Sequence, residues 1–426
     1  MNLSDPYPTH SQTERIALQA VWSGRVNSRV ELARALGVSK VAVSKPIARL
    51  LASGLLAEEQ GDASHTGRPP IQLALKADSF YSIGVSLFNR HGAIALVDAR
   101  QEIVAQEPLG DMPAPSEARL AEIKNRIRRL LARHDVPRGK LCGVGLAVSG
   151  ISDPVKGRII HSPDFPEDRD FDLCPPLARA FDAPCQLMNI PHLLALMEHR
   201  WGGARGFSDF LYLHSQGFGL GLFLRGALYR GARHWAGELG EMQVRAHQDG
   251  DLTRRSGTLG EVAPLYRVTD RLKDLMTRGG GTLVGRYFKP GSKYVTIEMV
   301  TAAIEAGDQF SAQLLSETFL VIGEAALSLA FLLNPQAIFL DPFTARIPQV
   351  TVDVVRRLAS LYGPRDWSLQ VQILPARYGE EDLARGAALL PAAARLGVDW
   401  DRPEIPRASQ RRSAHPSSSR TGVPHA

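Results

Sequence analysis

The hydrophobic pattern of this 426-residue chain changes once, near Phe80, and that change limits the folds open to it. Before Phe80, apolar residues recur at helical spacing in three short pieces between Gln12 and Leu56. After it, strands alternate with helices, which is typical of an α/β domain. The pattern therefore predicts a small helical domain followed by a larger α/β domain. With 44% apolar residues, both have enough material for a core.

The three helical pieces have the end signals of separate helices. Ser23-Gly24 ends the first, Gly37 closes the second as a C-cap residue, and Ser39 caps the third. Two short helices joined by a tight Gly turn form a helix-turn-helix unit, whose second helix lies in a major groove of DNA. The predicted apolar stripes are Ile16, Leu18, Ala20 and Val21, then Val30, Leu32, Ala33, Ala35 and Leu36, and finally Val41, Val43, Ile47, Leu50 and Leu51.

The other face of the third helix is basic, and Lys, Arg and Ser there can bond phosphates or base edges. Apolar runs 55–57 and 71–75, joined by a polar Gly-rich loop, predict a wing with Arg68 at its tip, suited to a phosphate or the minor groove. Pro46 removes one backbone hydrogen bond within the helix and favours a kink. The predicted DNA contacts are Ser39, Lys40, Val41, Ser44, Lys45, Arg49 and Arg68.

Charge agrees with this prediction. The net charge is +6, and residues 1–76 carry nine basic against six acidic side chains, half of the excess. The second basic region, from Arg402 to Ala426, is rich in Arg, Ser and Pro without apolar periodicity, so we predict a disordered tail. The alternative for the first region is a small protein-binding module with a solvated basic face. The Gly turn, the cap, the basic helix and the wing occur in the order that favours DNA binding.

Beyond Phe80 a similar order of elements occurs twice. Segments 81–87 and 92–98 predict a strand hairpin, followed by a helix over 117–133 and a strand over 141–148. Segments 210–213 and 219–224 predict a second hairpin, with helices over 297–306 and 308–333 and a strand over 337–340. This repetition predicts two related lobes with a cleft between them.

Composition excludes several protein classes. The longest apolar stretch, Ala325 to Leu333, is well short of the roughly 20 residues of a membrane span, and the first ten residues are polar, so we expect neither a membrane protein nor an ordinary signal peptide. Cys142, Cys174 and Cys185 are odd in number and lack C-x-x-C spacing, which fits the reducing cytoplasm.

Several of these segments resemble the ROK family (repressors, open reading frames and sugar kinases). The resemblance rests on the winged helix-turn-helix and on three segments, 224–232 (LRGALYRGA), 236–240 (AGELG) and 333–338 (LNPQAI), and it covers about residues 12–395. It implies an actin-like fold of two lobes, of the sugar kinase, Hsp70 and actin type. Members with an N-terminal winged helix are similar to the xylose and N-acetylglucosamine repressors, which bind DNA operators as oligomers and respond to a carbohydrate.

The sequence departs from the kinases of this family at three places. Ser86–Arg90 replaces the Asp-x-Gly-Gly-Thr motif for ATP phosphates, and Asp341-Pro342 replaces the adenosine-side Gly-Gly. Ile190 occupies the position of the general base, and isoleucine cannot accept a proton. We therefore expect no kinase activity, no catalytic residue and no cofactor.

The zinc motif of the family is missing as well. Glu241 stands where a His ligand is expected, while Asp251, Thr253 and Thr258 stand where cysteines are expected. Structural zinc favours thiolate and imidazole ligands, so we predict no metal. The resemblance leaves a partial sugar site, whose expected effector contacts are Asp164, Asn189, Glu238, Glu241 and Glu261.

The sequence thus predicts an α/β transcriptional regulator, a repressor of a carbohydrate uptake or catabolism operon acting as a homodimer or homotetramer. Its alternatives are an ATP-dependent sugar kinase, or a ligand-free regulator that uses the second domain only to oligomerise. The predicted domains are a disordered start (1–11), a winged helix-turn-helix (12–76), a ROK domain (77–398) and a disordered tail (399–426). The lobes are 77–187 and 188–398, with a C-terminal helix returning to the first lobe.

Overall fold

The computed structural model describes residues 10–24, 26–60, 71–88, 92–167, 169–244, 257–263, 265–288, 295–346 and 371–398. The chain forms two compact units, of which the first holds residues up to Ser79 together with Arg395–Val398, and the second holds Phe80–Ala394. Apart from residues 10 and 11, the predicted disordered ends lie outside the described residues.

The first unit contains three helices and a two-stranded antiparallel sheet, in which Leu56 pairs with Leu75 and Gln60 with Ile71. Each helix begins at a serine whose side chain accepts a backbone N–H of the first turn. Gly37 ends the second helix at φ 65°, a conformation that favours glycine. The elements are α1 Gln12–Trp22, α2 Arg29–Leu36, α3 Lys40–Ala52, β1 Leu56–Gln60 and β2 Ile71–Leu75.

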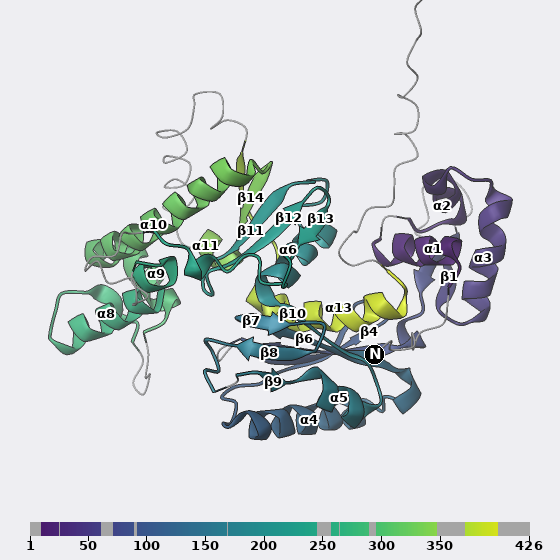
Figure 1. Ribbon diagram of the computed structural model, residues 1–426, viewed down its shortest axis with the longest axis horizontal. Helices are drawn as coiled ribbons and strands as arrows, with labels where there is room; N and C mark the ends of the chain where they lie inside the picture. The colour runs from purple at the N-terminus through teal and green to yellow at the C-terminus, as the bar shows by residue number, and fades with distance from the viewer. Residues whose placement is uncertain are drawn as a thin grey trace, which may run out of the picture. The chain divides into compact units, whose positions relative to one another are not determined.

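The second unit is built around two five-stranded sheets (Figure 1). The first has the strand order β10-β6-β3-β4-β5, with β3 antiparallel to β4 and parallel to β6. Its strands are β3 Tyr81–Leu87, β4 Ala93–Asp98, β5 Ile103–Pro108, β6 Leu141–Val148 and β10 Cys185–Asn189. A small three-stranded sheet follows β6, with β7 Ile151–Asp153, β8 Arg158–His161 and β9 Phe171–Asp172.

The second sheet repeats the topology of the first, in the order β13-β12-β11-β14-β15. Here β11 is antiparallel to β12 and parallel to β14, as β3 is to β4 and β6. Its strands are β11 Phe210–His214, β12 Gly219–Leu224, β13 Ala227–Tyr229, β14 Ala337–Leu340 and β15 Gln372–Pro375. The two lobes predicted from the repeated pattern are therefore present.

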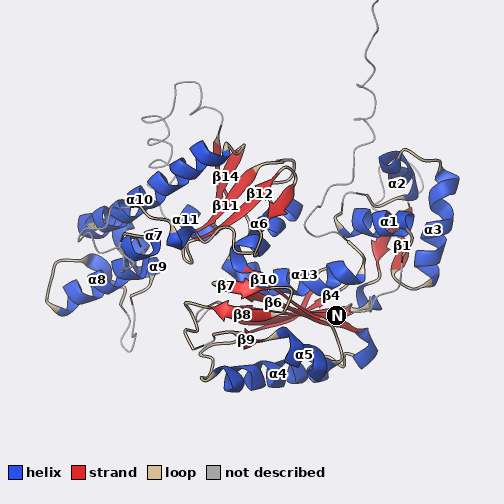
Figure 2. Cartoon of the chain, viewed as in Figure 1, coloured by secondary structure: helices blue, strands red, loops and turns tan. Residues whose placement is uncertain are grey.

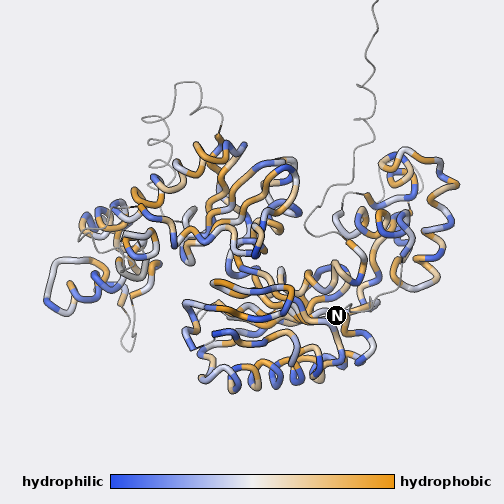
Figure 3. Tube along the Cα trace, viewed as in Figure 1, coloured by the Kyte–Doolittle hydropathy of each residue, from blue (hydrophilic) through white to orange (hydrophobic). Residues whose placement is uncertain are grey.

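Each sheet has helices on both faces (Figure 2). Helices α4 Ser116–Arg133 and α5 Cys174–Phe181 cover one face of the first sheet, where Ile123, Ile127 and Leu177 join its core. Helices α7 Leu259–Val262, α8 Leu265–Thr277, α9 Ile297–Glu305 and α10 Gln309–Leu333 share a core with the second sheet. Hydrophobic residues predominate along α10 (Figure 3). It is long and apolar enough to cross a membrane by length and composition, and 56% of its most apolar window is buried inside the fold.

The other face of each sheet is covered by a helix that comes, in sequence, after the last strand of the other sheet. Helix α6 Ile190–Trp201 follows β10 but packs on the second sheet, where a Cβ at Gly221 would be 2.4 Å from the Pro191 carbonyl oxygen. Helix α13 Leu383–Arg395 follows β15 and the short turn η6 Glu380–Asp382, but packs on the first sheet. A Cβ at Gly145 would be 1.8 Å from the Ala387 carbonyl oxygen. Glycine is required at both positions because the helix backbone lies directly on the strand.

Candidate functional site

The outward face of α3 is the candidate DNA-binding surface. Val43, Pro46, Ile47 and Leu50 are buried, so the opposite side of the helix faces solvent. That side carries Val41, Ala42, Lys45 and Ala48, all exposed. The helix runs through Pro46 as one element, and the proline ring belongs to the core of the unit.

Val41 corrects the apolar stripe predicted for α3. Its side chain is 81% exposed and takes no part in the core, so its assignment to that stripe was wrong. Val30 of α2 is also exposed, at 45%. Helical spacing alone cannot tell a residue at the edge of a stripe from one beyond it. The exposure of Val41 is compatible with its other predicted role, a DNA contact.

The remaining predicted DNA contacts differ in the hydrogen bonds and ion pairs that their side chains form. Ser39 accepts the Ala42 backbone N–H at 3.3 Å, and the Ser44 hydroxyl donates to the Lys40 carbonyl at 2.8 Å. Arg49 is paired with Glu14 of α1, with Arg49 Nε 3.4 Å from Glu14 Oε1. Lys40 and Lys45 are exposed. Arg68 lies outside the described residues.

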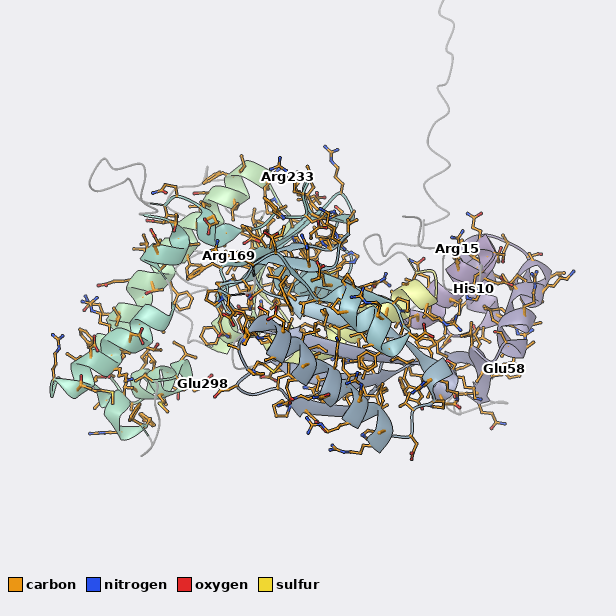
Figure 4. The ribbon with its side chains drawn as sticks, turned by 60° about the horizontal axis from the view of Figure 1, so that its bottom comes forward. His10, Arg15, Glu58, Arg169, Arg233 and Glu298 are labelled. Carbon is orange, nitrogen blue, oxygen red and sulfur yellow. The ribbon has the colours of Figure 1, made fainter. Side chains whose placement is uncertain are left out.

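The Arg49–Glu14 pair belongs to the framework of the first unit. Glu14 is nearly buried and completes the capping box of α1, accepting the Ser11 backbone N–H at 2.7 Å. That hydrogen bond, aided by the nearby Arg49 guanidinium, lowers the pKa of Glu14 although burial opposes the shift. Arg29 of α2 and Glu58 of β1 form a second link, at 2.7 Å. Glu58 and Arg15 are labelled on this unit in Figure 4.

In the second unit, hydrogen bonds connect the segments that carry several of the predicted effector contacts. The Ser149 hydroxyl, just after β6, donates to Asp164 at 2.5 Å, and the Asn189 amide donates to the adjacent Gly150 carbonyl at 2.8 Å. The buried His192 of α6 is 2.8 Å from the Ala236 carbonyl oxygen through its Nε2 atom. Asp164, Asn189 and the segment that leads to Glu238 therefore meet around the start of α6.

Two of the three glutamates share one turn. Glu238 precedes and Glu241 ends the short turn η4, Leu239–Glu241. Glu238 is half-buried, and its burial, together with the charge of Glu241, raises the pKa of Glu238 to about 7. Glu261 is on α7, which packs against η4 closely enough that a Cβ at Gly260 would be 3.1 Å from the Gly240 carbonyl oxygen.

Two polar residues that directly follow strands β14 and β6 have roles that the sequence did not predict. Asp341 follows β14 and is buried; its carboxylate accepts the backbone N–H groups of Ser215 at 2.7 Å and Thr344 at 2.8 Å. Ser149 holds the equivalent position after β6. Both directly follow apolar strands, which was the available signal, but the sequence separation of 126 residues between Ser215 and Asp341 hides their pairing.

Comparison with known proteins decides the family. The model of the ROK family matches residues 82–394. The chain belongs to the ROK family. Among curated relatives, the N-acetylglucosamine repressor of Escherichia coli O157:H7 is 24% identical over 73% of this chain and 75% of its own length. The xylose repressor of Caldicellulosiruptor bescii is 23% identical over 76% of this chain and 81% of its own length.

Solved structures show the same fold. A ROK family transcriptional regulator, a homolog of the E. coli MLC protein, has a TM-score of 0.72 at 18% identity, over 91% of this chain and 98% of its own. A ROK family glucokinase from Streptomyces griseus, solved with glucose and AMPPNP, has a TM-score of 0.59 at 22% identity, over 73% of this chain and 98% of its own. At these identities the likeness concerns the fold, which is the actin-like ROK fold.

Within the ROK domain, the structure locates the positions that depart from the kinase and zinc motifs. Ile190 is the first residue of α6 and is 1% exposed, beside Asn189. The described residues contain no group of three or more His, Cys, Asp or Glu side chains able to hold a metal ion. Of the positions compared with zinc ligands, Asp251 and Thr253 lie outside the described residues.

Proposed function

We propose that the first unit binds a DNA operator and that the ROK domain takes a sugar-like effector, which makes the protein a repressor of a carbohydrate uptake or catabolism operon. The observation that carries this proposal is the outward face of α3, formed by Val41, Ala42, Lys45 and Ala48. The similarity to an N-acetylglucosamine repressor and a xylose repressor supports the same function.

The outward face of α3 has the chemistry of a major-groove surface. The Val41 side chain can contact a thymine methyl group, and Lys45 can reach a phosphate or the acceptor edge of guanine. Ala42 and Ala48 have small side chains that let the helix backbone approach the bases. Lys40, in the first turn, is placed to bind a phosphate next to the groove.

Mobility-shift titration with DNA from upstream of the protein's own gene tests this directly. Lys45→Ala should weaken binding by about tenfold. It should also reduce the slope of log affinity against log salt concentration by about one, as expected for the loss of one phosphate contact. Lys156→Ala is the matched control, because Lys156 is an exposed lysine of the ROK domain, and it should leave affinity unchanged. Wild-type protein that binds this DNA no better than random DNA would contradict the proposal.

Arg49 needs a separate experiment because it also holds α1. Arg49→Ala removes the partner of the nearly buried Glu14, so weaker DNA binding by this variant would also follow from a loosened unit. The double variant Arg49→Ala, Glu14→Gln removes both charges. Restored stability with DNA binding still lost would assign Arg49 to the DNA contact; recovery of both would assign it to the framework.

A regulator without kinase activity is favoured over a sugar kinase by two features. The general-base position holds the buried Ile190, and the turn after β11 already has an internal anion, because Asp341 occupies the N–H groups of Ser215 and Thr344. Phosphate oxygens would need such N–H groups. A coupled ADP-release assay with a panel of hexoses should show no turnover. Turnover abolished by Asn189→Ala would establish the kinase instead.

The effector site that we propose comprises Asp164, Asn189, Glu238, Glu241 and Glu261. Thermal-shift measurements with xylose, N-acetylglucosamine and glucosamine test it, since a ligand at 100 times its Kd adds about 2.7 kcal/mol to stability. Asn189→Ala should abolish the shift, whereas Asn125→Ala, an exposed position on α4, should retain it. No shift with any sugar would favour the ligand-free regulator. We further propose a cytoplasmic homodimer or homotetramer, testable by light scattering.

A further inference from the structure

His214 lies where three separate parts of the ROK domain meet. It ends β11 and is 2% exposed. Its Nε2 atom is 3.2 Å from Glu380 Oε1, at the start of η6, and its ring lies edge-on to Phe88, with centroids 5.3 Å apart. Phe88 follows β3 of the first sheet. One buried imidazole thus contacts the first lobe, the second lobe and the segment that leads into α13.

Three acidic groups among the described residues act on His214. Glu380 is hydrogen-bonded to His214. Asp341 accepts the backbone N–H of the next residue, Ser215, and Asp164 interacts electrostatically with His214. Burial disfavours an imidazolium ion. The hydrogen bond that His214 donates to Glu380, together with the charges of Asp341, Glu380 and Asp164, nevertheless raises the pKa of His214 above its usual value.

Helix α13 begins directly after the turn that contains Glu380. It follows η6 without a break and is seated on the first sheet, where a Cβ at Gly84 would be 1.8 Å from the Ala384 carbonyl oxygen. Arg385 also donates to the Gln101 carbonyl at 3.0 Å. The last residue of α13, Arg395, and residues 396–398 belong to the first unit. The helix that begins after η6 therefore ends at residues that belong to the first unit.

We propose that His214, as an imidazolium ion, is the positioning residue that couples Asp164 of the candidate effector site to α13 and hence to DNA binding. An effector that binds the Asp164 carboxylate reduces the negative potential that this carboxylate exerts on the His214 imidazolium. The proton then leaves to solvent, the bond to Glu380 weakens, and the start of α13 loosens. This inference rests on the proposed function for its last step, the change in DNA binding, and on the structure alone for the link from His214 to α13.

The pH dependence of α13 tests that link without an effector. Because the pKa of folded His214 is raised, its stabilising effect is complete below the unfolded-state pKa of about 6.5 and is lost as the pH rises through the folded-state value. Hydrogen exchange on the full chain, expressed as protection factors, should show α13 peptides several-fold less protected at about pH 9 than at about pH 6. Peptides from α4, on the other face of the first sheet from α13, serve as an internal reference.

Three variants decide the outcome. His214→Gln should make the protection of α13 independent of pH, and so should Glu380→Gln, which changes a side chain only 16% exposed without touching the imidazole. His134→Gln, at an exposed histidine after α4, should keep the wild-type profile. Wild-type pH dependence in both His214→Gln and Glu380→Gln would overturn the proposal.

Asp164→Asn tests the effector side of the link. Removing this carboxylate should lower the pKa of His214 and move the midpoint of the α13 profile to lower pH; an unmoved midpoint would exclude Asp164 from the coupling. Operator affinity measured over the same pH range tests the output. A wild-type protein that binds no operator would refute the proposed function, while its α13 profile would still test the role of His214.

Discussion

The two lobes of the ROK domain share one topology but use equivalent positions differently. In each, a central strand lies between an antiparallel and a parallel neighbour, β3 in the first sheet and β11 in the second. The parallel neighbours, β6 and β14, are followed by Ser149 and Asp341. Ser149 donates to Asp164, a predicted effector contact, whereas Asp341 binds the turn of its own lobe.

This difference separates the two strand ends by what satisfies the polar groups around them. In the second lobe a buried carboxylate accepts the N–H of Ser215, in the turn after β11, and the N–H of Thr344, so both groups are satisfied without a ligand. In the first lobe the equivalent residue is neutral and faces residues suited to sugar hydroxyls. The first lobe therefore contributes Asp164 to the candidate effector site beside a neutral strand end, whereas the second lobe, to which Glu238, Glu241 and Glu261 belong, holds its own strand end with an internal carboxylate.

The largest effect should come from the glycines under the crossing helices. Gly145→Val and Gly221→Val each place side-chain atoms within the backbone of the crossing helix, and each should lower the free energy of unfolding by about 3 kcal/mol or more. Urea denaturation measures this. Gly139→Ala is the control, since a Cβ there meets no atom within 4 Å. A loss confined to one of the two valine variants would show that α6 and α13 are not equivalent.

The next effect contrasts the two strand ends. Asp341→Ala leaves the Ser215 and Thr344 N–H groups and the Ser215 hydroxyl without their acceptor, and should cost about 2–3 kcal/mol. Ser149→Ala removes one hydroxyl and should cost about 1 kcal/mol. Asp341→Asn, which keeps an acceptor oxygen, should fall between them. Equal losses of stability in Asp341→Ala and Ser149→Ala would contradict the proposed distinction between a strand end satisfied by its own carboxylate and a strand end that faces a ligand.

The sequence predicted the elements that have a clear local signal. The serine cap and glycine end of the helix-turn-helix, both strand hairpins and the long helix α10 were predicted close to their observed bounds. The helices of the first unit show an apolar period because solvent covers one face, whereas the hairpin strands, buried on both faces, show short continuous apolar runs. The family resemblance was confirmed, and the effector contacts Asp164, Asn189 and Glu238 stay a prediction.

What the sequence did not predict lies in helices buried all round. Helix α6 is buried from Ile190 to Arg200, including Glu198 and His199, so its polar residues indicate no solvent face. Glu198 instead accepts the backbone N–H groups of Gly203 and Arg377. Helix α13 is mostly alanine and leucine with Pro391 inside it, and shows no one-sided stripe either. The packing of α6 on the second sheet is a tertiary property that no local period contains, whereas the return of a C-terminal helix to the first lobe was part of the predicted domain organisation.

The smallest effect should come from the pair of glutamates in η4. The pKa of Glu238, about 7, is above its unfolded value, so the folded state binds the extra proton and stability should fall as the pH rises from about 4.5 to about 7. Glu238→Gln should remove this slope and gain about 1 kcal/mol at about pH 8, allowing for partial solvent screening. Glu241→Gln should keep the slope but move it to lower pH, because it removes only the neighbouring charge. Thermal denaturation over this pH range separates the two variants. A slope unchanged in Glu238→Gln would place the titrating group elsewhere.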